Sequence, residues 1–146
     1  MKKIISSLLL ATLAAGAGLA QAQSAATTIV AEFQGPGGHS SSNYGRTSAL
    51  HAAARAMMEL QKSGLPAGSY SVSELTGGNS VNSIASDGKF VVKLNPASGV
   101  SAADLLAKVT AASKTGAETE NAFRNVKPGD LTAGAPADIR YSVKQQ

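Results

Sequence analysis

Residues 35–42 read Gly-Pro-Gly-Gly-His-Ser-Ser-Ser and separate a strand-like segment from a helix-like one. The three glycines and the proline allow sharp turns and positive φ, so the loop can present a side chain from a backbone that is fixed at both ends. His39 is one of two histidines in the chain and is our first candidate for a functional side chain. The simpler interpretation is a strand-to-helix turn that carries a solvated histidine.

The hydrophobic period changes across this loop. In residues 29–33 the odd positions are apolar, which is the period of a half-buried strand. After the loop, Thr47 or Ser48 can cap a helix that Gly64 and Pro66 are predicted to end. The apolar face predicted for this helix consists of Leu50, Ala53, Ala54, Met57 and Leu60.

The same signals recur in the second half of the chain. Alternation predicts strands over residues 70–75, 89–94 and 139–143. Residues 101–104, Ser-Ala-Ala-Asp, are typical of a helix start, and Gly116 is predicted to end that helix. Between it and the last strand we expect only a short helical turn and a series of tight turns.

The order strand, helix, strand, strand, helix, strand predicts an α+β fold, the ferredoxin-like split β-α-β-β-α-β sandwich, with a four-stranded antiparallel sheet and two helices on one face. We expect strand 70–75 at an open edge of the sheet. We also expect strands 29–33 and 89–94 to be parallel neighbours. On that expectation, the loop after the first strand and the connection 76–88 lie at opposite ends of the sheet.

Composition limits the function. The 146 residues suit one domain, and the formal net charge of +4 comes without any Lys/Arg cluster, so we expect no nucleic-acid partner. The chain has no cysteine, which excludes disulfides, thiolate catalysis and thiolate zinc sites.

The N-terminus is typical of an export signal. Residues 1–22 hold two lysines, an apolar run over residues 4–13 and a final Ala-Gln-Ala. Cleavage there would leave Gln23 as the first residue and residues 23–146 as a single domain. We expect the mature protein to be exported, either periplasmic or secreted, and not to span a membrane.

A second glycine-rich stretch, residues 77–84, reads Gly-Gly-Asn-Ser-Val-Asn-Ser-Ile. Together with Gly-Gly-His-Ser-Ser at 37–41 and the alanine-rich helix that starts at Ser48, it resembles the dimerisation, or lid, domain of the two-domain zinc exopeptidases. That family includes carboxypeptidase G, aminoacylase and succinyl-diaminopimelate desuccinylase. The resemblance extends over roughly residues 27–143, and because the family's lid is itself a ferredoxin-like sandwich, it implies the fold that the element order predicts.

The resemblance also implies roles for particular residues. His39 would reach into the active site of an opposing subunit and stabilise the oxyanion formed at the scissile carbonyl. Asn82 would hold the substrate carboxylate or backbone, and Gly38, Gly77 and Gly78 would belong to the same binding loops.

The catalytic domain of that family supplies two zinc ions from His, Asp and Glu ligands, and no such arrangement occurs in this sequence. His51 is expected on a helix surface, and Glu118 and Glu120 on a solvated turn. We therefore predict no metal site and no cofactor in this chain, with zinc present only if a partner's catalytic domain brings it.

Three functions agree with these observations. The first is a stand-alone, non-catalytic module that forms a homodimer or docks on a partner. The second is the lid portion of a zinc exopeptidase, which contributes His39 in trans to a partner's catalytic chain or binds a peptide-like ligand. The third is a periplasmic domain that binds a small ligand.

Overall fold

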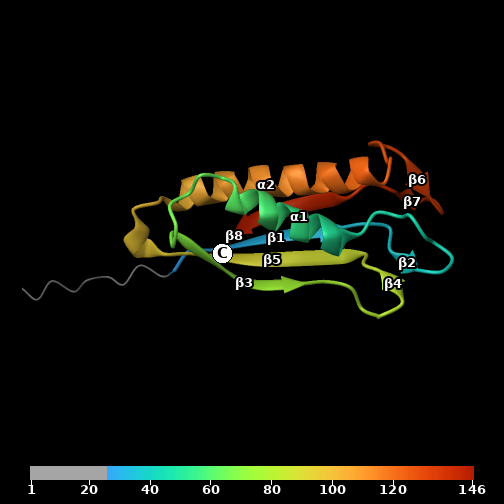
Figure 1. The fold of residues 1–146 in the computed structure, drawn as a ribbon, viewed down its shortest axis with the longest axis horizontal. Helices are drawn as coiled ribbons and strands as arrows, with labels where there is room; N and C mark the ends of the chain where they lie inside the picture. Colours follow the sequence, from blue (N-terminus) through green and yellow to red (C-terminus); the bar gives the residue numbers. More distant parts are fainter. Residues whose placement is uncertain (1–25) are drawn as a thin grey trace, which may run out of the picture.

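The computed structural model describes residues 26–146, so the predicted signal peptide over residues 1–22 lies outside the described residues. Figure 1 shows one four-stranded sheet with both helices on the same face. The sheet has the order β3-β5-β1-β8, in which β1 is Thr28–Gln34, β3 Tyr70–Thr76, β5 Asp87–Leu94 and β8 Arg140–Gln145. The helices are α1, Ala49–Gln61, and α2, Ala102–Phe123. The predicted fold class is confirmed, with β3 at one open edge.

The remaining elements are short. A 3-10 helix, η1, spans Pro96–Ser98 before α2. Two small bridges join β2, Gly38–His39, to β4, Ser83–Ile84, and β6, Leu131–Thr132, to β7, Ala135–Pro136. Among residues 26–146, no helix combines the length and the apolar character needed to cross a bilayer.

One expectation about strand direction is wrong. β1 and β5 are antiparallel, with Ile29 opposite Val92 and Phe33 opposite Gly88. In this topology α1 returns the chain so that β1 and β3 run the same way, and β5 reverses direction between them. The loop after β1 and the connection from β3 to β5 therefore meet at the same end of the sheet.

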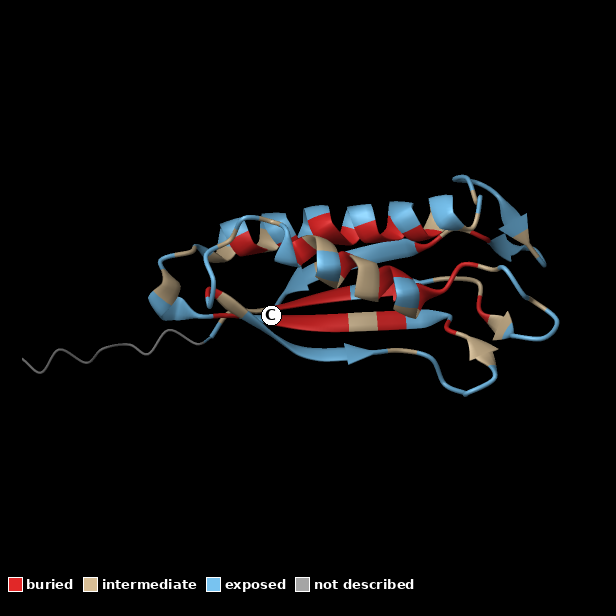
Figure 2. Ribbon diagram, in the orientation of Figure 1, coloured by how far each residue is buried: buried red, intermediate tan, exposed pale blue. Residues whose placement is uncertain are grey.

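The core lies between the sheet and the helices (Figure 2). Ile29, Ala31 and Phe33 of β1 point into it, as the alternating pattern predicts. The rings of Phe33 and Phe90 are 6.0 Å apart at their centroids. Burying each Phe contributes about 1.5–3 kcal/mol, so these two rings anchor a cluster of buried residues that otherwise consists of aliphatic side chains.

Helix α1 begins where the sequence predicts, because the Ser48 side chain accepts a hydrogen bond from the N–H of His51. Its buried face is rotated from the predicted one. The fully buried positions are Ala49, Ala52, Ala53, Ala56 and Leu60. Leu50, Ala54 and Met57 are only half-buried on one flank, so the predicted apolar stripe mixes the core face with a partly exposed flank.

Gly116 does not end α2, contrary to the prediction, and the helix continues to Phe123. A Cβ at Gly116 would lie 2.6 Å from the backbone nitrogen of Ala56 and 2.7 Å from the carbonyl oxygen of Ala52. Glycine is present here because the two helices approach each other too closely for a side chain, and not because the backbone needs positive φ.

Candidate functional site

The structure brings His39 and Asn82 together at the end of the sheet where β1 ends. The bridge between β2 and β4 places His39 opposite Ser83, and the N–H of Ser40 donates to the carbonyl oxygen of Asn82 over 2.9 Å. The Nε2 atom of His39 and the Nδ2 atom of Asn82 are 3.1 Å apart, and both side chains are exposed. The proximity follows from the antiparallel pairing of β1 and β5. Parallel strands, as predicted from the sequence, would have put the two loops at opposite ends of the sheet.

Ser41 determines which ring nitrogen of His39 can carry the hydrogen. Its N–H donates to Nδ1 over 3.3 Å, and its Oγ lies 2.8 Å from the same atom. Because a backbone N–H can only donate, Nδ1 acts as the acceptor and the neutral ring carries its hydrogen on Nε2. The Nε2–H is therefore the donor that faces Asn82, whose amide can turn either its oxygen or its nitrogen toward the ring.

Local contacts hold the His39 loop in place. The N–H and the Nδ2 of Asn43 each donate to the carbonyl oxygen of His39 over 3.0 Å, and Arg46 Nη1 donates to the carbonyl oxygen of Gly37 over 3.1 Å. Gly38 has φ +124°, and a Cβ there would lie 2.8 Å from Asn43 Nδ2. The loop therefore needs a glycine next to the histidine.

The second glycine motif shapes the facing loop. A Cβ at Gly77 would lie 2.5 Å from the carbonyl oxygen of Asp87, so the chain leaves β3 in contact with the first residue of β5. The N–H of Ser83 donates to the carbonyl oxygen of Ser80 in the turn that carries Asn82. Both motifs thus build loops that place two exposed polar side chains side by side. Such a pair can donate hydrogen bonds to a carbonyl or carboxylate oxygen.

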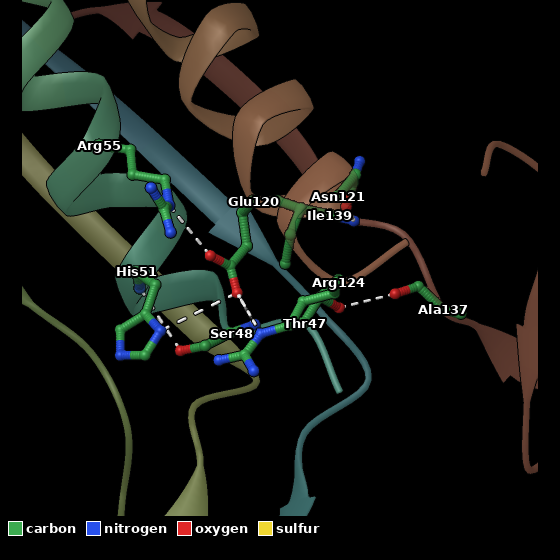
Figure 3. A network of polar contacts seen from close by, with 9 residues as sticks. All are labelled: Thr47, Ser48, His51, Arg55, Glu120, Asn121, Arg124, Ala137 and Ile139. Carbon is green, nitrogen blue, oxygen red and sulfur yellow. Dashed lines mark hydrogen bonds and ion pairs between the residues drawn. The ribbon is translucent and has the colours of Figure 1, made fainter. Parts of the chain in front are cut away.

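Sequence reasoning missed Glu120, which was expected on a solvated turn and is in fact fully buried within α2. Figure 3 shows the polar side chains around its carboxylate. Its Oε1 accepts from the N–H of Ser48 over 3.1 Å and faces Arg124 Nε at 3.4 Å, while its Oε2 accepts from Arg55 Nε over 3.1 Å. His51 lies at the edge of this cluster, with Nδ1 3.9 Å from Oε1 and 58% of its side chain exposed.

The Glu120 cluster joins the start of α1 to the last turns of α2. Extending the spacing of the buried residues Leu105, Val109 and Ala112 past Gly116 places Glu120 on the same helix face. The sequence shows this spacing only if the predicted helix is continued past Gly116. Glu118 is exposed, as expected, but it lies within α2 and not on a turn, with Oε1 3.8 Å from the Nζ of Lys114.

No group of three metal-ligating side chains occurs within residues 26–146. The pair formed by His39 and Asn82 alone does not provide a metal centre. What the described residues offer at this end of the sheet is hydrogen bonding.

Comparisons with known proteins agree with the fold. The family described as the peptidase dimerisation domain matches residues 21–121, more than two thirds of the chain. A search of curated proteins by sequence found no match.

Among solved structures, a hydantoinase/carbamoylase family amidase from Burkholderia ambifaria is similar with a TM-score of 0.54 and 18% identity over 83% of this chain and 27% of that one. A hydantoinase/carbamoylase family amidase from Burkholderia multivorans gives a TM-score of 0.53 and 22% identity over the same two shares. The aminobenzoyl-glutamate utilization protein from Klebsiella pneumoniae gives 0.50 and 20% identity over 82% of this chain and 28% of that one.

The chain spans little more than a quarter of the length of these proteins, and the low identities show the fold alone. The family match covers most of the sequence, and the sheet order and helix placement agree with the predicted ferredoxin-like dimerisation fold. The chain therefore belongs to the peptidase dimerisation domain family.

Proposed function

We propose that this chain is an exported, self-associating module without catalytic activity of its own, and that it forms a homodimer through the edge strand β3. The observation that carries the proposal is the exposure of β3: every residue from Ser71 to Thr76 is exposed, including Val72 at 36% and Leu75 at 41%. An edge strand offers unpaired backbone groups to a second strand, and apolar side chains there favour burial.

The opposite edge is better protected. β8 carries Arg140 and Lys144, whereas the only charged residue of β3 is Glu74, whose Oε2 lies 3.0 Å from the Nζ of Lys89 within the same chain. Charged side chains on an edge strand oppose pairing. Self-association is therefore favoured at β3.

Helix α1 extends the same surface. Arg55 of α1 donates a hydrogen bond to Glu120 of α2, so this side of α1 faces α2. Because successive helix residues are 100° apart, Leu50 and Met57 lie on the flank of α1 opposite Arg55. α1 contacts β5, β1 and β3, while α2 contacts β8 and β1. The half-buried apolar flank of α1 therefore lies on the side of the molecule where β3 is the edge. A two-fold axis there would bury the edge strand and this flank together.

The test is the molar mass in solution, measured by light scattering at tens of micromolar. We expect a dimer for the natural sequence and a monomer for the double variant Ser71→Lys, Ser73→Lys, because the substitutions would place like charges along both of the paired edge strands. The matched control is Ser142→Lys in β8, which should remain a dimer. A monomeric natural protein, or a control that dissociates equally, would contradict the proposal.

The adjacency of His39 and Asn82 favours a second candidate, the lid portion of a zinc exopeptidase. In that function the Nε2–H of His39 would donate to a substrate oxygen in a partner's active site. Zinc analysis of the pure protein, together with assays for hydrolysis of acylated amino acids and dipeptides, distinguishes the two. Activity in a zinc-containing complex that is lost in His39→Ala supports the second candidate, whereas neither zinc nor activity is expected for the isolated module.

A further inference from the structure

The second open edge of the sheet, strand β8, carries unpaired backbone groups. Among the described strands, β8 pairs only with β1. The N–H of Gln146 donates to the carbonyl oxygen of Thr28, and hydrogen-bonded pairs of this kind recur at every second residue of antiparallel strands. The N–H and carbonyl groups of Tyr141, Val143 and Gln145 therefore point away from β1. They are available to a further strand.

The side chains of β8 divide between the two faces of the sheet. The ring of Tyr141 lies 6.3 Å from that of the core residue Phe33, so Tyr141 is on the helix side. Because side chains alternate along a strand, Arg140, Ser142 and Lys144 project from the helix-free face. Within residues 26–146 no ion pair is found for Arg140 or Lys144. Two cations on this edge therefore lack an acidic partner.

On the helix-free face, a shallow basin of about 540 Å³ lies beside β8. The two cations of β8 line its outer side, whereas Glu32 of β1 and Asp87 of β5 lie further toward the middle of the sheet. Lys89 also lines the basin, but its Nζ is paired with Glu74. Unpaired positive charge is therefore concentrated at the β8 edge, and an acidic partner fits better along the edge than over the centre of the basin.

We propose that β8 binds an extended acidic segment of another protein, which joins the sheet as a further strand. The charges of β8 oppose pairing with a second copy of β8, but they attract a strand that carries carboxylates on one face. Those carboxylates would lie opposite Arg140 and Lys144. The side chains on the other face of the added strand would cover Tyr141, which is 37% exposed, and Val143. A dimer through β3 leaves this edge free.

The experiment uses the peptide acetyl-Thr-Glu-Val-Thr-Val-Glu-Thr-amide, which has both glutamates on one face of an extended chain. It is titrated into the natural protein at constant ionic strength, and backbone amide NMR shifts are followed. We expect saturable shifts that are largest at Tyr141, Val143 and Gln145. A peptide with lysines in place of the glutamates should not bind. N-methylation of both valines should weaken binding at least tenfold, because it removes the N–H groups that face β8 and keeps the charge.

The matching change in the protein is the double variant Arg140→Gln, Lys144→Gln, which should weaken binding at least tenfold. The control is the double variant Lys93→Gln, Lys108→Gln, in β5 and α2, which removes the same charge and should leave binding unchanged. All four side chains are exposed, so these variants should fold. The modified peptides test the proposal without any change to the protein.

Shifts that do not saturate, equal weakening by the two double variants, or an N-methylated peptide that binds as tightly as the parent would each overturn the proposal. Phosphatidylglycerol vesicles that bind through Arg140 and Lys144 when the peptide does not would also overturn it, because the edge would then face a lipid surface. The mass of the dimer is measured without peptide, so failure here is distinguishable from failure of the proposed self-association.

Discussion

Gly116→Ala should destabilise the protein although it places the best helix former in the middle of a helix. On an exposed helix surface the change from glycine to alanine gains about 1 kcal/mol. Here the new Cβ would lie 2.6 Å from the backbone nitrogen of Ala56 and 2.7 Å from the carbonyl oxygen of Ala52, so the helices must separate. Overpacking of this kind costs about 1–3 kcal/mol. Because the new Cβ would meet backbone atoms, we expect an overpacking cost at the upper end of this range. After the gain in helix propensity is subtracted, the free energy of unfolding should fall by about 2 kcal/mol.

Urea unfolding followed by far-UV circular dichroism measures this loss, with all variants at one protein concentration because self-association contributes to stability. Thr110→Ala, at an exposed position of α2, is the control and should change the free energy of unfolding by less than about 0.5 kcal/mol. A Gly116→Ala protein as stable as the natural one, or more stable, would refute the close helix contact.

Further changes test other parts of the structure. Glu120→Gln should lower the free energy of unfolding by about 3 kcal/mol, because it removes the charge between two arginines, whereas Glu118→Gln on the surface should have little effect. Ser113→Ala should raise the thermal midpoint, with a gain of about 1 kcal/mol, since the Oγ is buried without a hydrogen-bond partner; a lower midpoint would reveal a contact of that hydroxyl. His39→Ala should stay within about 1 kcal/mol of the natural stability, because the side chain is exposed, and a loss of several kcal/mol would make it a structural histidine. Mass spectrometry of the exported protein should find Gln23 at the N-terminus, and an intact Met1 there would contradict the signal peptide.

The sequence was sufficient for the fold because each strand and helix carries a local signal. Alternation located the four long strands, and serine caps located the starts of α1 and α2. The order of these elements then left few topologies, of which the split β-α-β-β-α-β sandwich is the common one.

Gly116 shows the limit of local signals. A glycine that ends a helix and a glycine that lets a second helix approach have the same appearance in the sequence. The difference lies in Ala52 and Ala56, sixty or more positions earlier in the chain. Because the predicted helix ended at Gly116, Glu120 was placed on an exposed turn. The buried contacts of its carboxylate were therefore not predicted.

The candidate site was predicted in its residues but not in its geometry. The two glycine motifs indicated His39 and Asn82, yet the contact between them depends on β1 and β5 being antiparallel. Strand direction follows from the path of the whole chain through α1 and β3, and nothing within either motif encodes it.

The central claim, self-association through β3, is tested most directly by cysteine cross-linking. The chain has no cysteine, so single cysteines placed in turn at each position from 71 to 75 can react only with their copies. Residues that face each other across paired antiparallel strands have Cα atoms about 4.5–5.5 Å apart, which is within reach of a disulfide. We predict rapid formation of a disulfide-linked dimer at one or two of these positions under mild oxidation, and none for Ser142→Cys in β8. Cross-linking at Ser142→Cys alone, or at no position of β3, would contradict the account.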